Sequence, residues 1–244
     1  MFKILVSTYV LLCVFALAAD PVPEEHKPEL VKTALNQAFI PTGFDSNDHV
    51  QVVVAGEFVN TCYQVGPYRA NIDEKAKQIV ISQTAYHYQG SCLDVTVPFN
   101  HVVELGILEA GEYGIVDAAS KWRLGTLSVT KATRPEVDDV PYAPVDDAFV
   151  VTDGTTGNPA LVFWGTLTKD CYTVTDKTVD PKLYDDVLVI RPLLKKLKED
   201  CNNGFFPFRV TYILPPELPR QFLLHVRSMN GQAINKVITP AINK

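Results

Sequence analysis

The stretch TCYQV, residues 61–65, recurs later in the chain as DCYTV, residues 170–174. A second cysteine follows each Cys-Tyr pair at the same interval, so that Cys62 precedes Cys92 and Cys171 precedes Cys201. Matching segments at a fixed shift are typical of an internal repeat. The sequence therefore predicts two copies of one unit, each with its own cysteine pair.

The shift that carries Cys62 onto Cys171 aligns further positions on both sides of these segments. The matching pairs, found without a gap, are Gly56 and Gly165, Val80-Ile81 and Val189-Ile190, Pro98-Phe99 and Pro207-Phe208, and Leu105 and Leu214. Upstream, Ala38-Phe39-Ile40 corresponds to Ala148-Phe149-Val150 after one inserted residue. The repeat thus covers the framework of each unit.

The N-terminal segment, residues 1–19, has the pattern of a secretory signal peptide. Lys3 supplies a positive charge, residues 4–17 are apolar, and small residues precede a cleavage point after Ala18 or Ala19. We expect a secreted or periplasmic mature protein. Cys13 lies within the apolar run, so we expect it to be removed with the signal rather than to carry a lipid.

Export to an oxidising compartment favours disulfides for the four remaining cysteines. Zinc is the alternative, but no two of these cysteines have the spacing of a zinc-ligand hairpin. Because two independently folding copies should each close their own bridge, we favour Cys62–Cys92 and Cys171–Cys201.

The mature chain is acidic. The full sequence has 22 basic and 28 acidic residues, and loss of Lys3 with the signal removes one of the basic ones. This balance argues against a nucleic-acid partner. No later stretch approaches the roughly 18 apolar residues of a membrane span, so we expect no transmembrane segment in the mature chain. We also expect no cofactor and no catalytic residues.

Short β-branched or aromatic segments, separated by turn residues, predict strands. They are residues 50–54, 78–81, 101–105, 186–190, 210–214 and 222–226. Seventeen prolines and thirteen glycines also favour an all-β chain. The predicted fold is two tandem immunoglobulin-like β-sandwich domains, each with one internal disulfide. Only two segments have helical spacing: 29–37, as a short arm, and 193–200, as a helical turn or polar hairpin.

The expected organisation is a signal peptide at 1–19, an N-terminal arm at 20–37, a first sandwich at 38–130 and a second at 148–244. Between the sandwiches, residues 131–147 contain three prolines and five acidic residues. That composition predicts an extended, semi-stiff linker that holds the two domains apart or restricts their orientations.

The segments at 38–45, 60–63, 97–99, 103–106 and 111–113 resemble a group of uncharacterised secreted bacterial proteins with immunoglobulin-like β-sandwich repeats. The resemblance covers the first unit; in the second, the Cys-Tyr, Cys and Pro-Phe elements remain, and Arg220 stands in place of Gly111. It implies export and a sandwich, and it implies no activity. Trp122 and Trp164 lie outside the cysteine pairs, unlike the tryptophan of antibody domains.

Two segments inside the disulfide loops are candidate binding surfaces. Tyr86, His87 and Tyr88 belong to an aromatic loop that could stack on a sugar or anchor a protein. The alternative is that both tyrosines are buried and His87 is exposed. The equivalent segment of the second unit is basic, with Lys195, Lys196 and Lys198. Drift of unimportant loops after duplication explains the same difference.

We expect an ordinary structural role for two other groups of side chains, the histidines and the acidic pairs. The histidines are His26, His49, His87, His101 and His225, and none belongs to a hydrolase or zinc motif. The acidic pairs Asp138-Asp139, Asp146-Asp147 and Asp185-Asp186 could bind calcium at a domain junction, but none has a calcium-loop pattern.

The leading hypothesis is therefore an exported, non-catalytic protein that binds a protein or glycan through its loops. The second hypothesis is a structural subunit that assembles at a surface. The third is a hydrolase with scattered catalytic residues. The absence of an Asn-x-Ser/Thr sequon favours a bacterial envelope.

Overall fold

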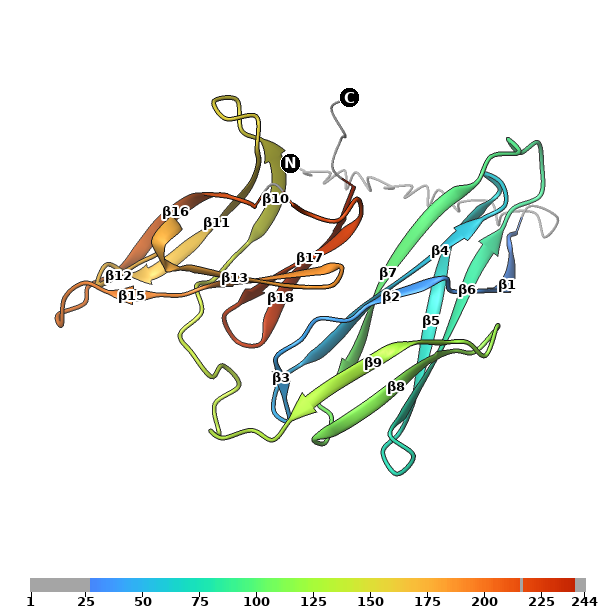
Figure 1. Ribbon diagram of the computed structural model, residues 1–244, viewed down its shortest axis with the longest axis horizontal. Coiled ribbons are helices and arrows are strands. Elements are labelled where there is room, and N and C mark those ends of the chain that lie inside the picture. Colours follow the sequence, from blue (N-terminus) through green and yellow to red (C-terminus); the bar gives the residue numbers. More distant parts are fainter. Residues whose placement is uncertain (1–26, 216, 240–244) are drawn as a thin grey trace, which may run out of the picture.

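The computed structural model describes residues 27–215 and 217–239, so the predicted signal peptide lies outside the described residues (Figure 1). Within these ranges the elements are β-strands and one short 3-10 turn, η2 (Asp176–Thr178). They form two sandwiches that lie side by side, the first in blue to green and the second in yellow to red. The all-β prediction is confirmed.

The first sandwich has a small and a large sheet. The small sheet has the order β2 (Gln37–Phe39), β4 (Val50–Phe58), β7 (Val97–Gly106). The large sheet has the order β1 (Glu29–Thr33), β6 (Gln78–His87), β8 (Gly111–Asp117), β9 (Arg123–Thr130), β3 (Phe44–Asp45), and β5 (Tyr63–Asp73) pairs along β6.

The second sandwich repeats this plan. Its small sheet has the order β10 (Asp147–Thr152), β11 (Pro159–Lys169), β16 (Asn203–Ile213). Its large sheet has the order β13 (Val179–Tyr184), β14 (Val187–Pro192), β17 (Phe222–Ser228), β18 (Gln232–Ile238). A separate short pair, β12 (Tyr172–Thr173) with β15 (Lys195–Lys196), lies beside the second disulfide.

The large sheets of the two sandwiches share one unusual pairing. In the first, β6 runs parallel to β8, with Gln78 opposite Gly114; in the second, β14 runs parallel to β17, with Val187 opposite Leu223. The shift that relates the two cysteine pairs also relates these positions. Parallel neighbours require a crossover, which passes through β7 in the first sandwich and β16 in the second. Immunoglobulin sheets are antiparallel, so this strand pairing is a distinct version of the sandwich.

Each sandwich has its own apolar core between its two sheets. The first is centred on residues such as Val52, Ile81 and Tyr113, and the second on residues such as Phe163, Leu188 and Phe222. Strands β4 and β14 are apolar on both faces, with Val53 and Val189 buried on the side away from their own core. A strand buried on both faces has a near-continuous apolar sequence, as in VQVVV at 50–54 and VLVI at 187–190.

Both expected disulfides are present, Cys62–Cys92 and Cys171–Cys201, with Cα atoms 5.4 and 5.0 Å apart. Each bridge ties the turn after the central strand of the small sheet to the segment that precedes its third strand, β7 or β16. The bridges therefore close equivalent ends of the two sandwiches.

The helical prediction for residues 29–37 is wrong, and so is the helical-turn alternative for residues 193–200. Residues 29–33 form β1, which pairs with Gln83–His87 of β6, and residues 195–196 form β15. A helix as short as 29–37 is marginal in water because nucleation is costly. The free edge of β6 instead offers residues 29–33 a ladder of hydrogen bonds.

Residues 131–147 do not hold the two domains apart, and they are packed rather than free. Asn47 donates to the carbonyls of Arg134 and Glu136, and Tyr142 and Ala143 are buried against the second sandwich. Since its apolar residues alternate with prolines, this segment packs as an extended chain.

The two sandwiches are in direct contact. The outer face of the first small sheet, with Phe39 and Val53, packs on the outer face of the second large sheet, with Val187, Val189 and Leu223. Ala55, Val102 and Val237 border this cluster. The two sandwiches are therefore joined by an apolar contact as well as by the packed segment 131–147.

Candidate binding surfaces

The disulfide end of the first sandwich carries an exposed apolar surface built on strands. Tyr86 lies in β6, directly between Leu30 of β1 and Gln64 of β5. Tyr88 follows β6, and its hydroxyl lies 3.3 Å from the Gln64 side-chain oxygen. The exposed fractions are 52% for Leu30 and 36% for each tyrosine. We call Leu30, Tyr86 and Tyr88 the aromatic platform.

The structure corrects the expected loop at residues 86–88. Tyr86 and His87 are strand residues, and the Tyr88 N–H donates to the carbonyl of Cys62. Both tyrosines are exposed and His87 is half-buried. The alternative with buried tyrosines and an exposed His87 is therefore wrong. A side chain on a paired strand loses less conformational entropy on binding than one on a free loop.

An aromatic stack supports the platform from below. The His87 ring stacks on Tyr63 at 4.6 Å, Tyr63 stacks on Phe58 at 5.6 Å, and Phe58 stacks on Phe99 at 4.4 Å. Phe58 and Phe99 belong to the core of the first sandwich. The stack therefore connects the end of β6 to the core.

Exposed apolar side chains also surround the first disulfide. They are Val59, Leu93 and Val95. The backbones on either side of the bridge are tied, because Thr61 N–H donates to the Leu93 carbonyl and Leu93 N–H donates to the Thr61 hydroxyl. Sequence reasoning missed these residues and Leu30; the available signal was the presence of apolar residues beside both cysteines.

The basic segment of the second sandwich has a different character. Lys195 and Lys196 form β15, and they are exposed, as is Lys198. Lys196 pairs with Glu199, and Lys198 lies 2.7 Å from Asp170. Asp170 also accepts hydrogen bonds from Asn202. Two of the three positive charges are therefore balanced within the segment.

The hydrogen bond from Lys198, followed by those from Asn202, lowers the pKa of Asp170 to about 2. A depressed carboxyl pKa stabilises the fold above the unfolded pKa, near 4, and the contribution is lost as the pH falls toward 2. We expect Asp170→Asn to show a shallower loss of melting temperature than the unsubstituted protein between pH 4 and 2. Asp176→Asn controls for the removed charge. Identical slopes for Asp170→Asn and the unsubstituted protein would contradict this role.

The two disulfide ends lie at opposite ends of the molecule, with β1 and β6 at one end and β12 and β15 at the other (Figure 1). The structure therefore does not bring the aromatic and basic segments together. Each has to act as a separate surface.

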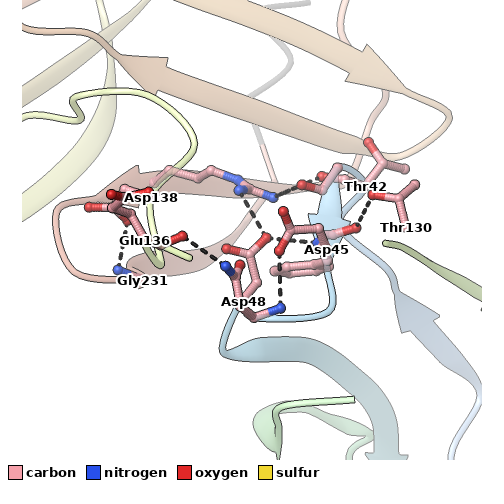
Figure 2. A network of polar contacts seen from close by, with 11 residues as sticks. Thr42, Asp45, Asp48, Thr130, Glu136, Asp138 and Gly231 are labelled. Atoms are coloured by element: carbon pink, nitrogen blue, oxygen red, sulfur yellow. Dashed lines mark hydrogen bonds and ion pairs between the residues drawn. The ribbon is translucent and has the colours of Figure 1, made fainter. Parts of the chain in front are cut away.

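A polar network lies at the junction of the sandwiches (Figure 2). The guanidinium of Arg227 donates to the Gly43 carbonyl at 2.5 Å, lies 3.5 Å from Asp48 Oδ2, and covers the Phe44 ring at 5.1 Å. Burial raises the pKa of the Asp48 carboxyl, and the Asp45 N–H and Arg227 partly offset this effect. The network joins β17 to the segment around β3.

The acidic pairs have hydrogen-bond partners in the protein. Asp138 accepts from the N–H groups of Asn230 and Gly231, Asp147 binds Lys236 at 2.6 Å, and Asp186 accepts from Gln37. Across residues 27–215 and 217–239, no three His, Cys, Asp or Glu side chains gather as a metal site would need. Asp138 and Asp186 thus contribute to the contact between segments.

Two of the described histidines, His101 and His225, have structural partners. His101 Nδ1 lies 3.0 Å from the Gln83 side-chain oxygen, and burial lowers its pKa. His225 is buried, its Nδ1 lies 2.7 Å from the Asn235 oxygen, and burial lowers its pKa to about 4. Asn235 donates to Gln51 of the first sandwich, and Gln51 donates to Glu104. Gln51 and Glu104 line a polar pocket of about 600 Å³ at the junction.

The family model of the ORF11 beta-sandwich domain matches residues 52–116. The match runs from β4 through most of β8, within the first sandwich. It supports a β-sandwich family. Searches of curated proteins and of solved structures gave no match. No helix in the described part of the chain is long and apolar enough to cross a membrane.

Proposed function

We propose that this chain is an exported, non-catalytic binding protein that holds a protein or glycan partner on the aromatic platform. The observation that carries the proposal is the position of Leu30, Tyr86 and Tyr88, exposed on neighbouring elements at one end of the first sandwich. Tyrosine rings offer a large, rigid contact area with a polar end, which suits both sugar stacking and protein anchoring.

The support beneath the platform strengthens the proposal. The stack from His87 to Phe99 and the Cys62–Cys92 bridge hold the end of β6 in one position. Preorganised contact residues bind with a smaller ordering cost. The two disulfides agree with export to an oxidising compartment.

We also infer that the two sandwiches arose from one duplicated unit. Four strands of each large sheet have the same order, β5–β6–β8–β9 and β13–β14–β17–β18, including the parallel pair, and one shift relates the residues of that pair. The aromatic platform is a feature of one copy only, since Lys195 and Leu197 stand where Tyr86 and Tyr88 lie.

The double substitution Tyr86→Ala and Tyr88→Ala should weaken partner capture at least about tenfold, because aromatic anchors commonly dominate binding energy. The measurement is cross-linking capture from the native culture, together with a glycan array, using the mature protein. Tyr184→Ala, which removes an exposed tyrosine of the second sandwich, is the matched control.

Retention of the same captured partner by the double variant would contradict the platform as the binding surface. A glycan-array signal lost in the double variant would identify a glycan, and a cross-linked polypeptide lost in it would identify a protein. Substrate turnover abolished by His87→Ala would overturn the non-catalytic assignment.

A further inference from the structure

The junction between the sandwiches shows how the outer face of a small sheet is covered in this protein. Phe39 of β2 and Val53 of β4 lie on that face of the first sandwich, beside Ala55 and Val102. The covering surface is the large sheet of the second sandwich, where Val187, Val189 and Leu223 make it apolar. An apolar face of this kind is thus buried against another sheet.

The small sheet of the second sandwich has an equivalent outer face, which we call the β10–β11–β16 face. Phe149 and Val162 are the counterparts of Phe39 and Val53, and Trp164 stands in place of Ala55. The Phe149 and Trp164 rings meet edge to face at 5.5 Å. The equivalent face is therefore more aromatic than the one buried at the junction.

This face is open. It lies on the side of the second sandwich away from the first, because the first packs on the opposite, large sheet (Figure 1). Phe205 is 87% exposed, Ile213 is 42% exposed and Val151 is 38% exposed. Large apolar side chains gathered on one face of a protein commonly mark an interaction site.

Charge placement on the large sheet of the first sandwich argues against a head-to-tail chain of copies. The positions equivalent to Val187 and Leu223 are Gln78 and Gly114, and Thr126 pairs with Gly114 as Val237 pairs with Leu223. Val80, the counterpart of Val189, is the apolar exception. The guanidinium of Arg123 also lies over Gly114, 3.3 Å from where a Cβ would be. Since most of these positions are polar or carry no side chain, that sheet does not offer the continuous apolar surface that covers a small sheet.

Charge placement on the β10–β11–β16 face favours a symmetric pairing. Asp147 of β10, Trp164 of β11 and Arg209 of β16 lie in one row across the sheet. The Asp147 carboxylate binds Lys236 of its own chain, and its side chain stays 43% exposed. A twofold axis parallel to the strands sets β10 of one copy over β16 of the other. Each Asp147 then faces Arg209 of the second copy, on either side of the two tryptophans.

We propose that the β10–β11–β16 face docks a second copy of this chain, and that the two copies form a twofold dimer. Twofold homodimers are the commonest closed assemblies, and they use the same patch on both subunits. The dimer places Phe149, Trp164, Ile213 and Phe205 at the interface. It does not depend on the aromatic platform, which lies on the other sandwich.

The mature protein should have the mass of a dimer by size-exclusion chromatography with light scattering. Ile213→Glu should weaken the dimer at least about 30-fold, because it adds a charge twice to one apolar interface. Ile107→Glu, at an exposed isoleucine of the first sandwich, is the matched control and should remain dimeric. Circular dichroism checks that both variants are folded.

Exchange of charge tests the twofold arrangement itself. Arg209→Glu and Asp147→Lys should each dissociate, because each homodimer contains two like-charged contacts. Since Asp147→Lys also removes the ion pair with Lys236, circular dichroism checks that this variant is folded. A mixture of the two variants should form a heterodimer, in which one contact is native and the other reversed but attractive. A monomer at all concentrations, a mass that grows beyond the dimer, a dimeric Ile213→Glu variant or a mixture that stays monomeric would each overturn the proposal.

Discussion

Arg227→Met is expected to lower the free energy of unfolding by about 3 kcal/mol at pH 7, since removal of one partner leaves a buried charge uncompensated. The Asp48 and Arg227 side chains are only 9% and 12% exposed, and Arg227 also binds the Gly43 carbonyl. Urea denaturation measures the loss. Burial already raises the pKa of Asp48, so its carboxyl group is more readily protonated near pH 4 than at pH 7. A protonated Asp48 needs no positive partner, so the variant should lose less stability near pH 4.

The double variant Asp48→Asn with Arg227→Met is the control for this prediction. With both charges removed, no uncompensated ion remains, so the double variant should lose less than the sum of the single losses. Asp48→Asn keeps a side-chain oxygen that can accept from the Asp45 N–H. Additive losses at pH 7 would contradict a coupled pair at the junction.

Replacement of Cys62 and Cys92 by serine should destabilise the first sandwich by about 3.6 kcal/mol, from the chain entropy of the loop that the bridge closes, with a sequence separation of 30. Native stabilities are only about 5–15 kcal/mol, so this loss is a large part of the total. Calorimetry of the mature protein, with and without reductant, measures it. The same pair of substitutions at Cys171 and Cys201 should have a similar effect, because the loop length is the same.

Two outcomes would contradict this account of the bridges. One is an unchanged melting temperature after loss of either disulfide. The other is equal loss of partner capture when the second bridge alone is removed, because the aromatic platform depends on the first bridge only.

Local patterns predicted much of the fold. The equal spacing of Cys62–Cys92 and Cys171–Cys201 indicated both bridges, and the β-branched runs indicated the central strands. These signals are local, or depend only on matching one segment with another. These signals can be read without knowing how the sheets pack on one another.

The sequence did not reveal contacts that depend on the neighbouring surface. Residues 29–33 have helical spacing, but the open edge of β6 makes them a strand. The run at 50–54 indicates a strand, but only the second sandwich explains why Val53 is buried. Arg227 and Asp48 are far apart in the chain, so no sequence pattern could pair them.

The sequence predicted only part of the candidate site, because the rest depends on contacts between strands. The sequence shows that residues 86–88 are aromatic. It does not show that the two tyrosines are exposed, because an alternating pattern permits either face of the strand to be buried. Leu30 joined the site only through the pairing of β1 with β6.

The pinned junction also has a mechanical consequence. Residues 134–138 are held by Asn47 and by the β17–β18 turn, and the sandwiches share an apolar contact. A pull applied between the two disulfide ends is therefore transmitted through buried sheets instead of stretching a slack tether. We therefore expect the two sandwiches to respond to such a pull as one stiff body.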